Sequence, residues 1–269
     1  MRELTSHLRK KNNIIGFVPT MGYLHKGHLS LVQKAKEMSD IVIVSIYVNP
    51  AQFSQGEDLS RYPRSIDHDL KLLENLNADY VFIPQDDQMY DPDHKTWVHV
   101  TELEDKLCGK SRLDHFRGVA TIVLKLLNIV IPDLMFMGEK DYQQVVILEK
   151  MISDLDLQVR IIRCPTVREA DGLAMSSRNS YLSSETRKNA ASIFQSLKHA
   201  KEIFHRGITD VKEVIREMKI MIESKGGKID YIEAFNSKTL QQIDHLSKGS
   251  RIALAVFFDS TRLIDNIEI

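Results

Sequence analysis

Short apolar runs alternate with amphipathic segments along the first two-thirds of the chain. The runs are rich in β-branched residues and continuous rather than alternating, which is typical of strands buried in a parallel sheet. The segments between them repeat apolar positions at helical spacing. The predicted strands are Ile14–Val18, Ile41–Val48, Tyr80–Ile83, Leu134–Met137 and Val159–Arg163, and the predicted helices are Leu29–Met38, Ile66–Leu76, Val119–Val130 and Tyr142–Leu155.

This strand–helix order predicts an open, doubly wound α/β sheet, in which ligands bind beyond the carboxyl ends of the strands. After the polar segment Glu169–Ser184 the pattern changes. Helical stretches at 184–206 and 210–225 lead into apolar runs with short connections, which predict a small antiparallel sheet over 231–235, 251–258 and 263–269. We expect a large domain at 1–174 and a second, smaller α+β domain at 175–269.

Composition narrows the class of protein. The 269 residues are 43% hydrophobic and 27% charged, and the net charge of −1 gives no basic field for nucleic acid. No apolar run is long enough to span a bilayer, and the N-terminus lacks a signal-peptide pattern. The cysteines, Cys108 and Cys164, form no disulfide framework. We therefore expect a cytoplasmic protein that binds neither nucleic acid nor membrane.

The most informative polar segment is Pro19–His28, which lies between a predicted strand and a predicted helix. His25 and His28 share one face of the first helical turn. A helix N-terminus offers N–H donors and the positive end of the dipole, which favours phosphate. Glycine has no Cβ, so Gly22 and Gly27 would let a nucleotide approach the backbone closely. Together these features predict chemistry on nucleotide phosphates.

Two simpler interpretations apply to this segment. His-x-x-His is half of a zinc site, but catalytic zinc usually takes three protein ligands and no third stands nearby in a metal-ligand pattern. An isolated H-x-G-H can also be a solvated helix start. The rest of the chain decides between these interpretations.

Polar residues follow two further strands. Asn49–Phe53 begins with an Asn-Pro turn signal and presents Gln52, whose neutral amide suits a small substrate with hydroxyl and carboxylate groups. The charged stretch Glu57–Arg64 is either a solvated loop, a mobile flap or a dimer contact. Arg112 is either a surface arginine or a fork for phosphate or carboxylate.

Gly138–Gln144 is a second strong signal, since its glycine lies where a strand gives way to a helix. Lys140 supplies a point charge suited to phosphate, and Asp141 either caps the helix or meets a ribose or metal. Gln144 shares a side of the first turn with Asp141, so Gln143 should face elsewhere. The third signal, Met175–Asn179, combines hydroxyls with a guanidinium, as in a polyphosphate grip.

With these segments in order, the chain strongly resembles the pantothenate synthetase family, the pantoate–β-alanine ligases. The H-x-G-H motif alone would indicate only the wider nucleotidyltransferase superfamily. The matching segments run nearly end to end and are Pro19–His28, Val48–Phe53, Glu57–Arg64, His115–Lys125, Gly138–Gln144, Pro165–Leu182 and Arg262–Ile267.

The resemblance implies a Rossmann-like first domain, a smaller second domain that closes over the site, and a homodimer. It also implies a two-step reaction. ATP and (R)-pantoate form pantoyl adenylate and pyrophosphate with Mg²⁺, and β-alanine then attacks the adenylate to give pantothenate and AMP. The Mg²⁺ ligands are not assigned.

Carried over position by position, the resemblance implies roles for individual residues. His25 and His28 would contact phosphates, with His28 the proton donor, and Lys140 joins them as a catalytic candidate. Gln52 and Gln144 would hold pantoate, with weaker transfers at Arg112 and His115. The implied ATP-binding residues are Met21, Gly22, Tyr23, Leu24, His25, Lys26, Gly27, His28, Gly138, Glu139, Lys140, Asp141, Val167, Met175, Ser176, Ser177 and Arg178.

Two departures and two rival functions accompany this resemblance. Lys26 adds a charge inside the motif and points either to solvent or inward, whereas Asp259 stands at a turn where the family often has glycine and should tolerate left-handed geometry. One rival is a nucleotidylyltransferase with a phosphorylated acceptor, disfavoured because Gln52 and Gln144 are neutral. The other is a non-enzymatic nucleotide-binding regulator, disfavoured by the intact cationic and hydroxyl positions.

Overall fold

The computed structural model describes residues 1–269 and divides into two compact units. The first unit comprises Met1–Asp105, Arg112–Glu139 and Gln144–Pro165. The second comprises Lys106–Ser111, Lys140–Gln143 and Thr166–Ile269. No helix is both long enough and apolar enough to cross a membrane.

The first unit is built on a five-stranded parallel sheet in the order β3-β2-β1-β4-β5. The strands are β1 (Ile15–Thr20), β2 (Ile41–Ile46), β3 (Tyr80–Phe82), β4 (Leu134–Gly138) and β5 (Arg160–Cys164). Central β1 pairs with both β2 and β4, so Phe17 lies opposite Ile43 on one side and Met135 on the other. The strand order reverses at β1, which makes its carboxyl end the switch point where ligands bind in such sheets.

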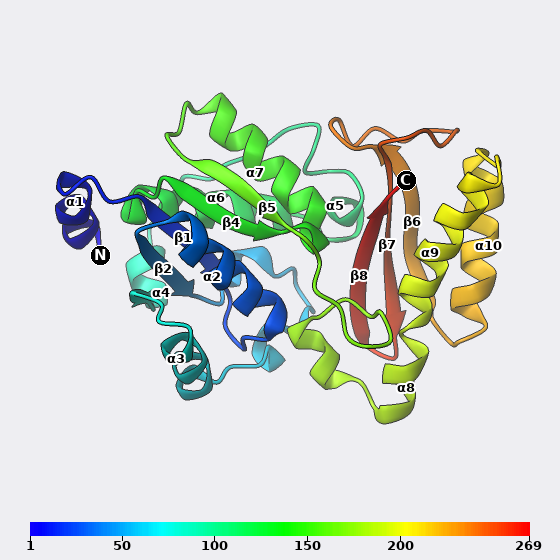
Figure 1. Ribbon diagram of the computed structural model, residues 1–269, viewed down its shortest axis with the longest axis horizontal. Helices are drawn as coiled ribbons and strands as arrows, with labels where there is room; N and C mark the ends of the chain where they lie inside the picture. Colours follow the sequence, from blue (N-terminus) through cyan, green and yellow to red (C-terminus); the bar gives the residue numbers. More distant parts are fainter. The chain divides into compact units, whose positions relative to one another are not determined.

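Helices flank this sheet (Figure 1). Because parallel crossovers are right-handed, α2 and α3 cover one face and α6 and α7 the other. Leu31 and Val32 of α2 pack with Leu73 of α3 in the core on the first face. The helices of this unit are α1 (Arg2–Lys10), α2 (Lys26–Met38), α3 (Ile66–Asn75), α4 (Asp86–Met89) and α6 (His115–Val130). Short 3-10 turns lie at Pro50–Gln52, Asp58–Arg61 and Glu139–Asp141. Helix α7 (Tyr142–Asp154) has its first two residues in the second unit and the rest in this one.

The second unit contains an antiparallel sheet in the order β6-β7-β8. Ile252 and Leu254 of β7 pack with Leu197 of α9 and Met218 of α10, so these two helices cover one face of the sheet (Figure 1). Its elements are α5 (Cys108–Ser111), a 3-10 turn at Ser177–Tyr181, α8 (Ser184–Asn189), α9 (Ser192–His205), α10 (Val211–Glu223), β6 (Lys228–Asn236), β7 (Ser250–Phe258) and β8 (Thr261–Glu268).

The predicted fold class is confirmed, with a parallel sheet followed by a small antiparallel one. Asp259 adopts the left-handed conformation expected of it, at φ 54° between β7 and β8. Several helices differ from the prediction, and the short α4 and α5 are not among the predicted elements. Helix α1 has no counterpart among the predicted helices, and the single helix predicted at 184–206 is two helices, because the chain turns at the buried pair Ala190–Ala191. Alanine favours helix, so no local signal marks this break.

The compact units also divide the chain differently from the expected boundary between residues 174 and 175. The second unit starts at Thr166 and takes in two short segments from earlier in the chain, Lys106–Ser111 and Lys140–Gln143. Side chains of its own sheet hold these segments, as when Lys110 pairs with Glu233 and Ser111 donates to Asp230.

Candidate active site

The segment after β1 is a tight left-handed turn held by a buried carboxylate. Gly22 and Tyr23 both have positive φ, at 80° and 50°. Successive N–H groups in a tight turn can point into one concavity that binds anions. Here the protein supplies the anion itself, because the side chain of Asp69 on α3 accepts from Tyr23 N and from Leu24 N, each at 2.7 Å.

This arrangement changes the explanation for Gly22. A Cβ at this position would lie 3.0 Å from Asp69 Oδ2 and 3.0 Å from Ile46, so the Cα faces protein and not open space. Gly22 is therefore required by the turn's backbone conformation and packing, rather than by close approach of a nucleotide. Asp69 is absent from the residues predicted for the site. Its signal in the sequence is a carboxylate four residues before Leu73, on the apolar face of the predicted helix.

His25 and His28 cap the N-terminus of α2 reciprocally. His25 Nδ1 accepts from Gly27 N at 3.1 Å, and His28 Nδ1 accepts from His25 N at 3.3 Å. The two ring centroids lie 4.0 Å apart. A ring nitrogen that accepts carries no proton, so both neutral rings hold their proton on Nε2. The caps thus give two Nε2–H donors at a helix N-terminus. Lys26, between them, is exposed to solvent.

Gln52 is buried, and its side-chain amide is oriented at both ends. Its Nε2 lies 2.9 Å from Met21 Sδ, and its Oε1 accepts from Asn49 Nδ2 at 3.1 Å. Asn49 also accepts from Tyr90 Oη at 2.9 Å. Burial raises the pKa of Tyr90 to about 12, so this hydroxyl stays a donor at neutral pH. The predicted Asn-Pro turn forms, and it brings Gln52 beside Met21 of the Pro19–His28 segment.

The Pro50–Gln52 turn packs against helix α6 at Gly118. A Cβ on Gly118 would lie 2.2 Å from Ala51 O and 2.7 Å from Gln52 N, both backbone atoms. Asn49 Nδ2 also donates to Gly118 O at 3.1 Å. The backbone of the Pro50–Gln52 turn therefore rests directly on α6, at a position where no side chain fits.

The candidate arginine at position 112 is already paired within the protein. Arg112 forks the carboxylate of Glu57, with Nε and Nη2 each 2.7 Å from an oxygen. Arg112 Nη1 lies 3.0 Å from His115 Nε2, and His115 Nδ1 lies 2.7 Å from Gln52 O. Because a guanidinium can only donate, Nε2 accepts and Nδ1–H donates to the carbonyl. Arg112 and His115 thus brace the Gln52 backbone and tie Glu57 to it.

Gly138 ends β4, and a 3-10 turn over Glu139–Asp141 leads into α7. The two glutamines that follow differ sharply. Gln143 is buried and its amide bonds the backbone of a neighbouring segment, accepting from Cys108 N at 3.0 Å and donating to Lys106 O at 2.6 Å. Gln144 is only half-buried and belongs to the first unit. The two glutamines therefore differ in burial and in the unit to which they belong.

In the second unit, one hairpin brings together the later ATP-binding candidates. Arg168 and Ala174 form an antiparallel bridge, and Met175 N donates to Val167 O at 3.0 Å. Ser176 then caps the 3-10 turn that carries Ser177 and Arg178, its Oγ accepting from Arg178 N at 3.3 Å. Residues apart in sequence thus share one short, hydrogen-bonded loop.

An ion pair fixes this hairpin to the sheet. Arg168 contacts both carboxylate oxygens of Asp265 on β8, at 2.6 and 3.0 Å, and its guanidinium lies 3.9 Å above the ring of Phe194. The Asp265 side chain is fully buried. Burial raises its pKa above the ordinary value, and the Arg168 guanidinium opposes that shift.

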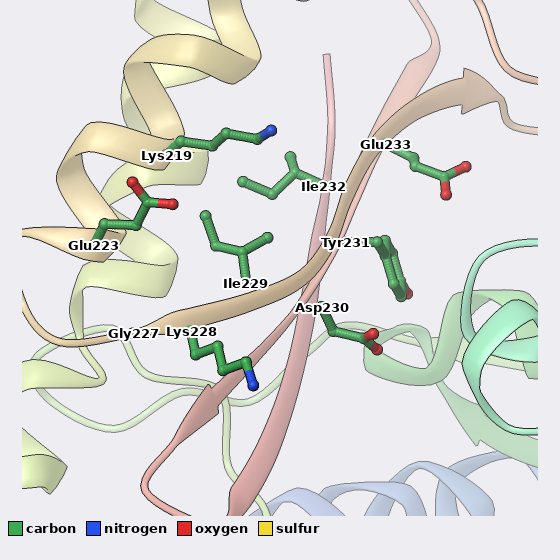
Figure 2. A pocket seen from close by; sticks show the side chains of 9 residues that line it. All are labelled: Lys219, Glu223, Gly227, Lys228, Ile229, Asp230, Tyr231, Ile232 and Glu233. Carbon is green, nitrogen blue, oxygen red and sulfur yellow. The ribbon is translucent and has the colours of Figure 1, made fainter.

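Each unit contains a cavity. One of about 330 Å³ in the first unit borders Met21 and Gly22 on the side of the turn that Asp69 holds. Another of about 590 Å³ runs along β6 in the second unit and is lined by Lys219, Glu223 and residues 227–233 (Figure 2). None of the candidate ATP or pantoate residues lines the second cavity, and we do not place the active site there. No group of three or more His, Cys, Asp or Glu side chains is placed to hold a metal ion.

A doubly wound parallel sheet with capped histidines at the switch-point helix defines the class, an α/β enzyme that acts on a nucleotide. Comparison with known proteins gives the family. The family model described as pantoate-beta-alanine ligase matches residues 1–268, and the chain belongs to this family.

Similar proteins and solved structures match nearly the whole length of this chain. The pantothenate synthetase of Caldicellulosiruptor bescii is 51% identical over 99% of this chain and 95% of its own, and that of Thermotoga petrophila is 48% identical over the same shares. The crystal structure of pantothenate synthetase from Thermus thermophilus matches with a TM-score of 0.93 at 40% identity, covering 98% of this chain and 97% of that one. Pantoate-beta-alanine ligase from Francisella tularensis, complexed with beta-gamma ATP and beta-alanine, matches with a TM-score of 0.83 at 38% identity, covering 99% and 95%.

Proposed function

We propose that this chain condenses (R)-pantoate with β-alanine in an ATP-dependent reaction, through a pantoyl adenylate. In the first step a pantoate carboxylate oxygen bonds to the α-phosphorus while the bond to the leaving pyrophosphate breaks. In the second step the β-alanine amine bonds to the acyl carbon, loses a proton and releases AMP. Family membership and the site's donor set together support this reaction.

The observation that carries the proposal is the reciprocal cap of His25 and His28. Charge accumulates on the α-phosphate oxygens and on the leaving pyrophosphate during adenylation. Two Nε2–H donors fixed by backbone hydrogen bonds, together with the N-terminus of α2, would stabilise that charge without reorganising. We assign His28 as the proton donor. Lys140 adds a cation suited to the same phosphates.

Gln52 and Gln144 are the proposed contacts to pantoate. Both are neutral amides that donate and accept, which matches hydroxyl and carboxylate groups. The Gln52 amide is oriented by Asn49 and Met21 before any ligand binds, so it loses little conformational entropy on binding. A phosphorylated acceptor would be better served by arginine or lysine at these positions.

The remaining predicted ATP contacts are divided between the two units. Met21–His28, Gly138 and Glu139 belong to the first, and Lys140, Asp141, Val167 and Met175–Arg178 to the second. We propose that Ser176, Ser177 and Arg178 grip the β- and γ-phosphates. Mg²⁺ would reach the site on the nucleotide, whose phosphate oxygens usually supply part of its ligand shell.

A homodimer and a cytoplasmic location remain part of the proposal. An exposed aromatic group supports the dimer. Trp97 is 36% exposed, stacks on Tyr90 at 6.0 Å between centroids and has Arg117 4.8 Å from its ring. Surface aromatic and arginine side chains of this kind are enriched at interfaces. Light scattering on the purified protein should then give twice the mass of one chain.

Exchange of labelled pyrophosphate into ATP tests the reaction directly. With Mg²⁺ and pantoate, and without β-alanine, exchange that depends on pantoate would establish carboxylate adenylation, and added β-alanine should release AMP. Exchange with a phosphorylated acceptor instead of pantoate would indicate a nucleotidylyltransferase. Binding of ATP with no exchange at all would indicate a regulator.

A further inference from the structure

The Lys140–Gln143 segment belongs to the second unit although both of its flanks belong to the first. Glu139 precedes it and Gln144 follows it, and each lies in the first unit. The segment forms the end of a 3-10 turn and the first two residues of α7. Side chains of the second unit also reach it.

Asn266 on β8 holds the backbone of Lys140. Its Nδ2 donates to Lys140 O at 3.0 Å, and its Oδ1 accepts from Arg251 Nη1 at 2.5 Å. Asn266 and Arg251 are both buried, at 6% exposure. With partners at both ends of its amide, the Asn266 side chain is fixed in one orientation and directs its N–H at Lys140.

Further contacts hold the same segment. The ring of Tyr142 lies 3.9 Å from the Arg251 guanidinium, and its hydroxyl donates to Ser237 O at 2.8 Å. The Gln143 amide bonds the Lys106 and Cys108 backbone. Arg251 therefore serves two contacts of the segment, one directly and one through Asn266.

The residue before Asn266 on β8, Asp265, also anchors a segment of this unit. Asp265, one residue earlier on β8, holds Arg168 and with it the hairpin that carries Met175–Arg178. Asn266 N also donates to Asp265 Oδ1 at 2.8 Å. Two consecutive residues of one strand thus anchor the two segments of this unit that carry phosphate-binding candidates.

We infer that Asn266 is a positioning residue for ATP, which acts through Lys140 by fixing its backbone to the strand that also anchors the Ser176–Arg178 loop. The expected effect on catalysis rests on the proposed function. The anchoring of the Lys140 backbone by Asn266 is independent of that function. Loss of the Asn266 donor should move Lys140 and leave the rest of the unit in place.

Asn266→Asp isolates the contact. Aspartate keeps an oxygen for Arg251 and loses the N–H that bonds Lys140 O. We expect pantoate-dependent pyrophosphate exchange to fall about 10- to 100-fold, as for a misplacement near 1 Å. The KM for ATP should rise while that for pantoate stays within about 2-fold, and Lys201→Ala, which removes a side-chain bond to Glu268 O on the same strand, should have no such effect.

A double-mutant cycle separates positioning from a structural role. In a Lys140→Ala background, Asn266→Asp should cost less than about 2-fold, because the side chain it positions is gone. Equal losses in both backgrounds, or losses that follow the melting temperature, would overturn the inference. Asn266→Ala provides a second variant with the same expectation.

Amide hydrogen exchange tests the anchor without any reaction. The peptide covering Gly138–Gln144 should exchange faster in Asn266→Asp than in the wild type or Lys201→Ala. Unchanged exchange in this peptide would refute the anchor whether or not the protein adenylates pantoate. Faster exchange in a protein that lacks pyrophosphate exchange would instead keep the anchor and reject the reaction.

Discussion

The side chain of Asp69 accepts the backbone N–H of Leu24 at 2.7 Å and so connects α3 to the residue just before His25. The carboxylate bonds Tyr23 N equally closely. It therefore sets the entry of the chain into α2 and the positions of both histidine caps, although Asp69 itself has no predicted contact with substrate.

Asp69→Asn should impair the first step more than its modest change in shape suggests. The amide has one acceptor oxygen, so one of the two N–H groups would face an NH₂ donor inside the protein. We expect kcat for pyrophosphate exchange to fall about 10²-fold and stability to fall by about 1–3 kcal/mol. Steady-state exchange and chemical denaturation measure the two effects. Wild-type exchange in the variant would show that the turn keeps its shape without the carboxylate.

His28→Asn should separate capping from catalysis. The Asn oxygen lies near the place of the His28 Nδ1 and can accept from His25 N, but the variant has no Nε2–H. The helix start should stay intact and turnover should be lost, whereas His28→Ala should lose both the cap and turnover. Circular dichroism melting and single-turnover formation of pantoyl adenylate compare the two. Turnover in His28→Asn would remove this ring from the proton transfer.

Gly118→Ala should raise the KM for pantoate far more than the KM for ATP. The new methyl would push on Ala51 O and displace the turn that carries Gln52, at an overpacking cost of about 1–3 kcal/mol. Gly16→Ala is a matched control, because its methyl would crowd Ser39 and Phe136 in the same unit but not this turn. If both variants shift the KM for pantoate alike, loss of stability and not displacement of Gln52 explains the effect.

The two adjacent glutamines should behave oppositely. Gln144→Ala should weaken pantoate binding and leave the melting temperature near that of the wild type. Gln143→Ala removes bonds to Lys106 O and Cys108 N from a buried amide and should cost about 1–3 kcal/mol of stability. Calorimetric titration with pantoate and thermal melting distinguish the variants. Equal loss of pantoate and ATP affinity in Gln144→Ala would place this residue outside the pantoate contacts.

Alkaline pH should destabilise the protein partly through Tyr90. Its folded pKa, about 12 because of burial, lies above the ordinary value of 10.0. Between these values the unfolded state loses the proton first, so the free energy of unfolding falls as pH rises. The ordinary tyrosine pKa lies between about pH 9 and about pH 11. The fall in melting temperature from the first pH to the second should therefore be smaller in Tyr90→Phe than in the wild type. An unchanged difference would show that Tyr90 does not contribute to the alkaline loss.

Local pattern is sufficient to predict the sheet but not the contacts that complete the site. Continuous apolar runs identify the strands, because central strands β1, β2 and β4 are buried along most of their length, and the H-x-G-H spacing identifies the helix start. Gly118 and Asn266 carry no such signal, because their roles arise from partners far away in sequence. Asp69 stands out as a carboxylate on an apolar helix face, but its partners, Tyr23 and Leu24, are equally distant in sequence. In the sequence Arg112 resembles an anion-binding residue, because its partner Glu57 becomes its neighbour only in the folded chain.

The second unit is built from three separate stretches of the chain, which affects how the protein can be divided into fragments. A gene fragment that begins at Thr166 would leave out Lys106–Ser111 and Lys140–Gln143. Its product would lack Cys108, Ser111 and the Lys140 carbonyl, which are one partner each of Tyr231, Asp230 and Asn266. No single cut separates the two units, so exchange of modules with a relative must carry three stretches of sequence together.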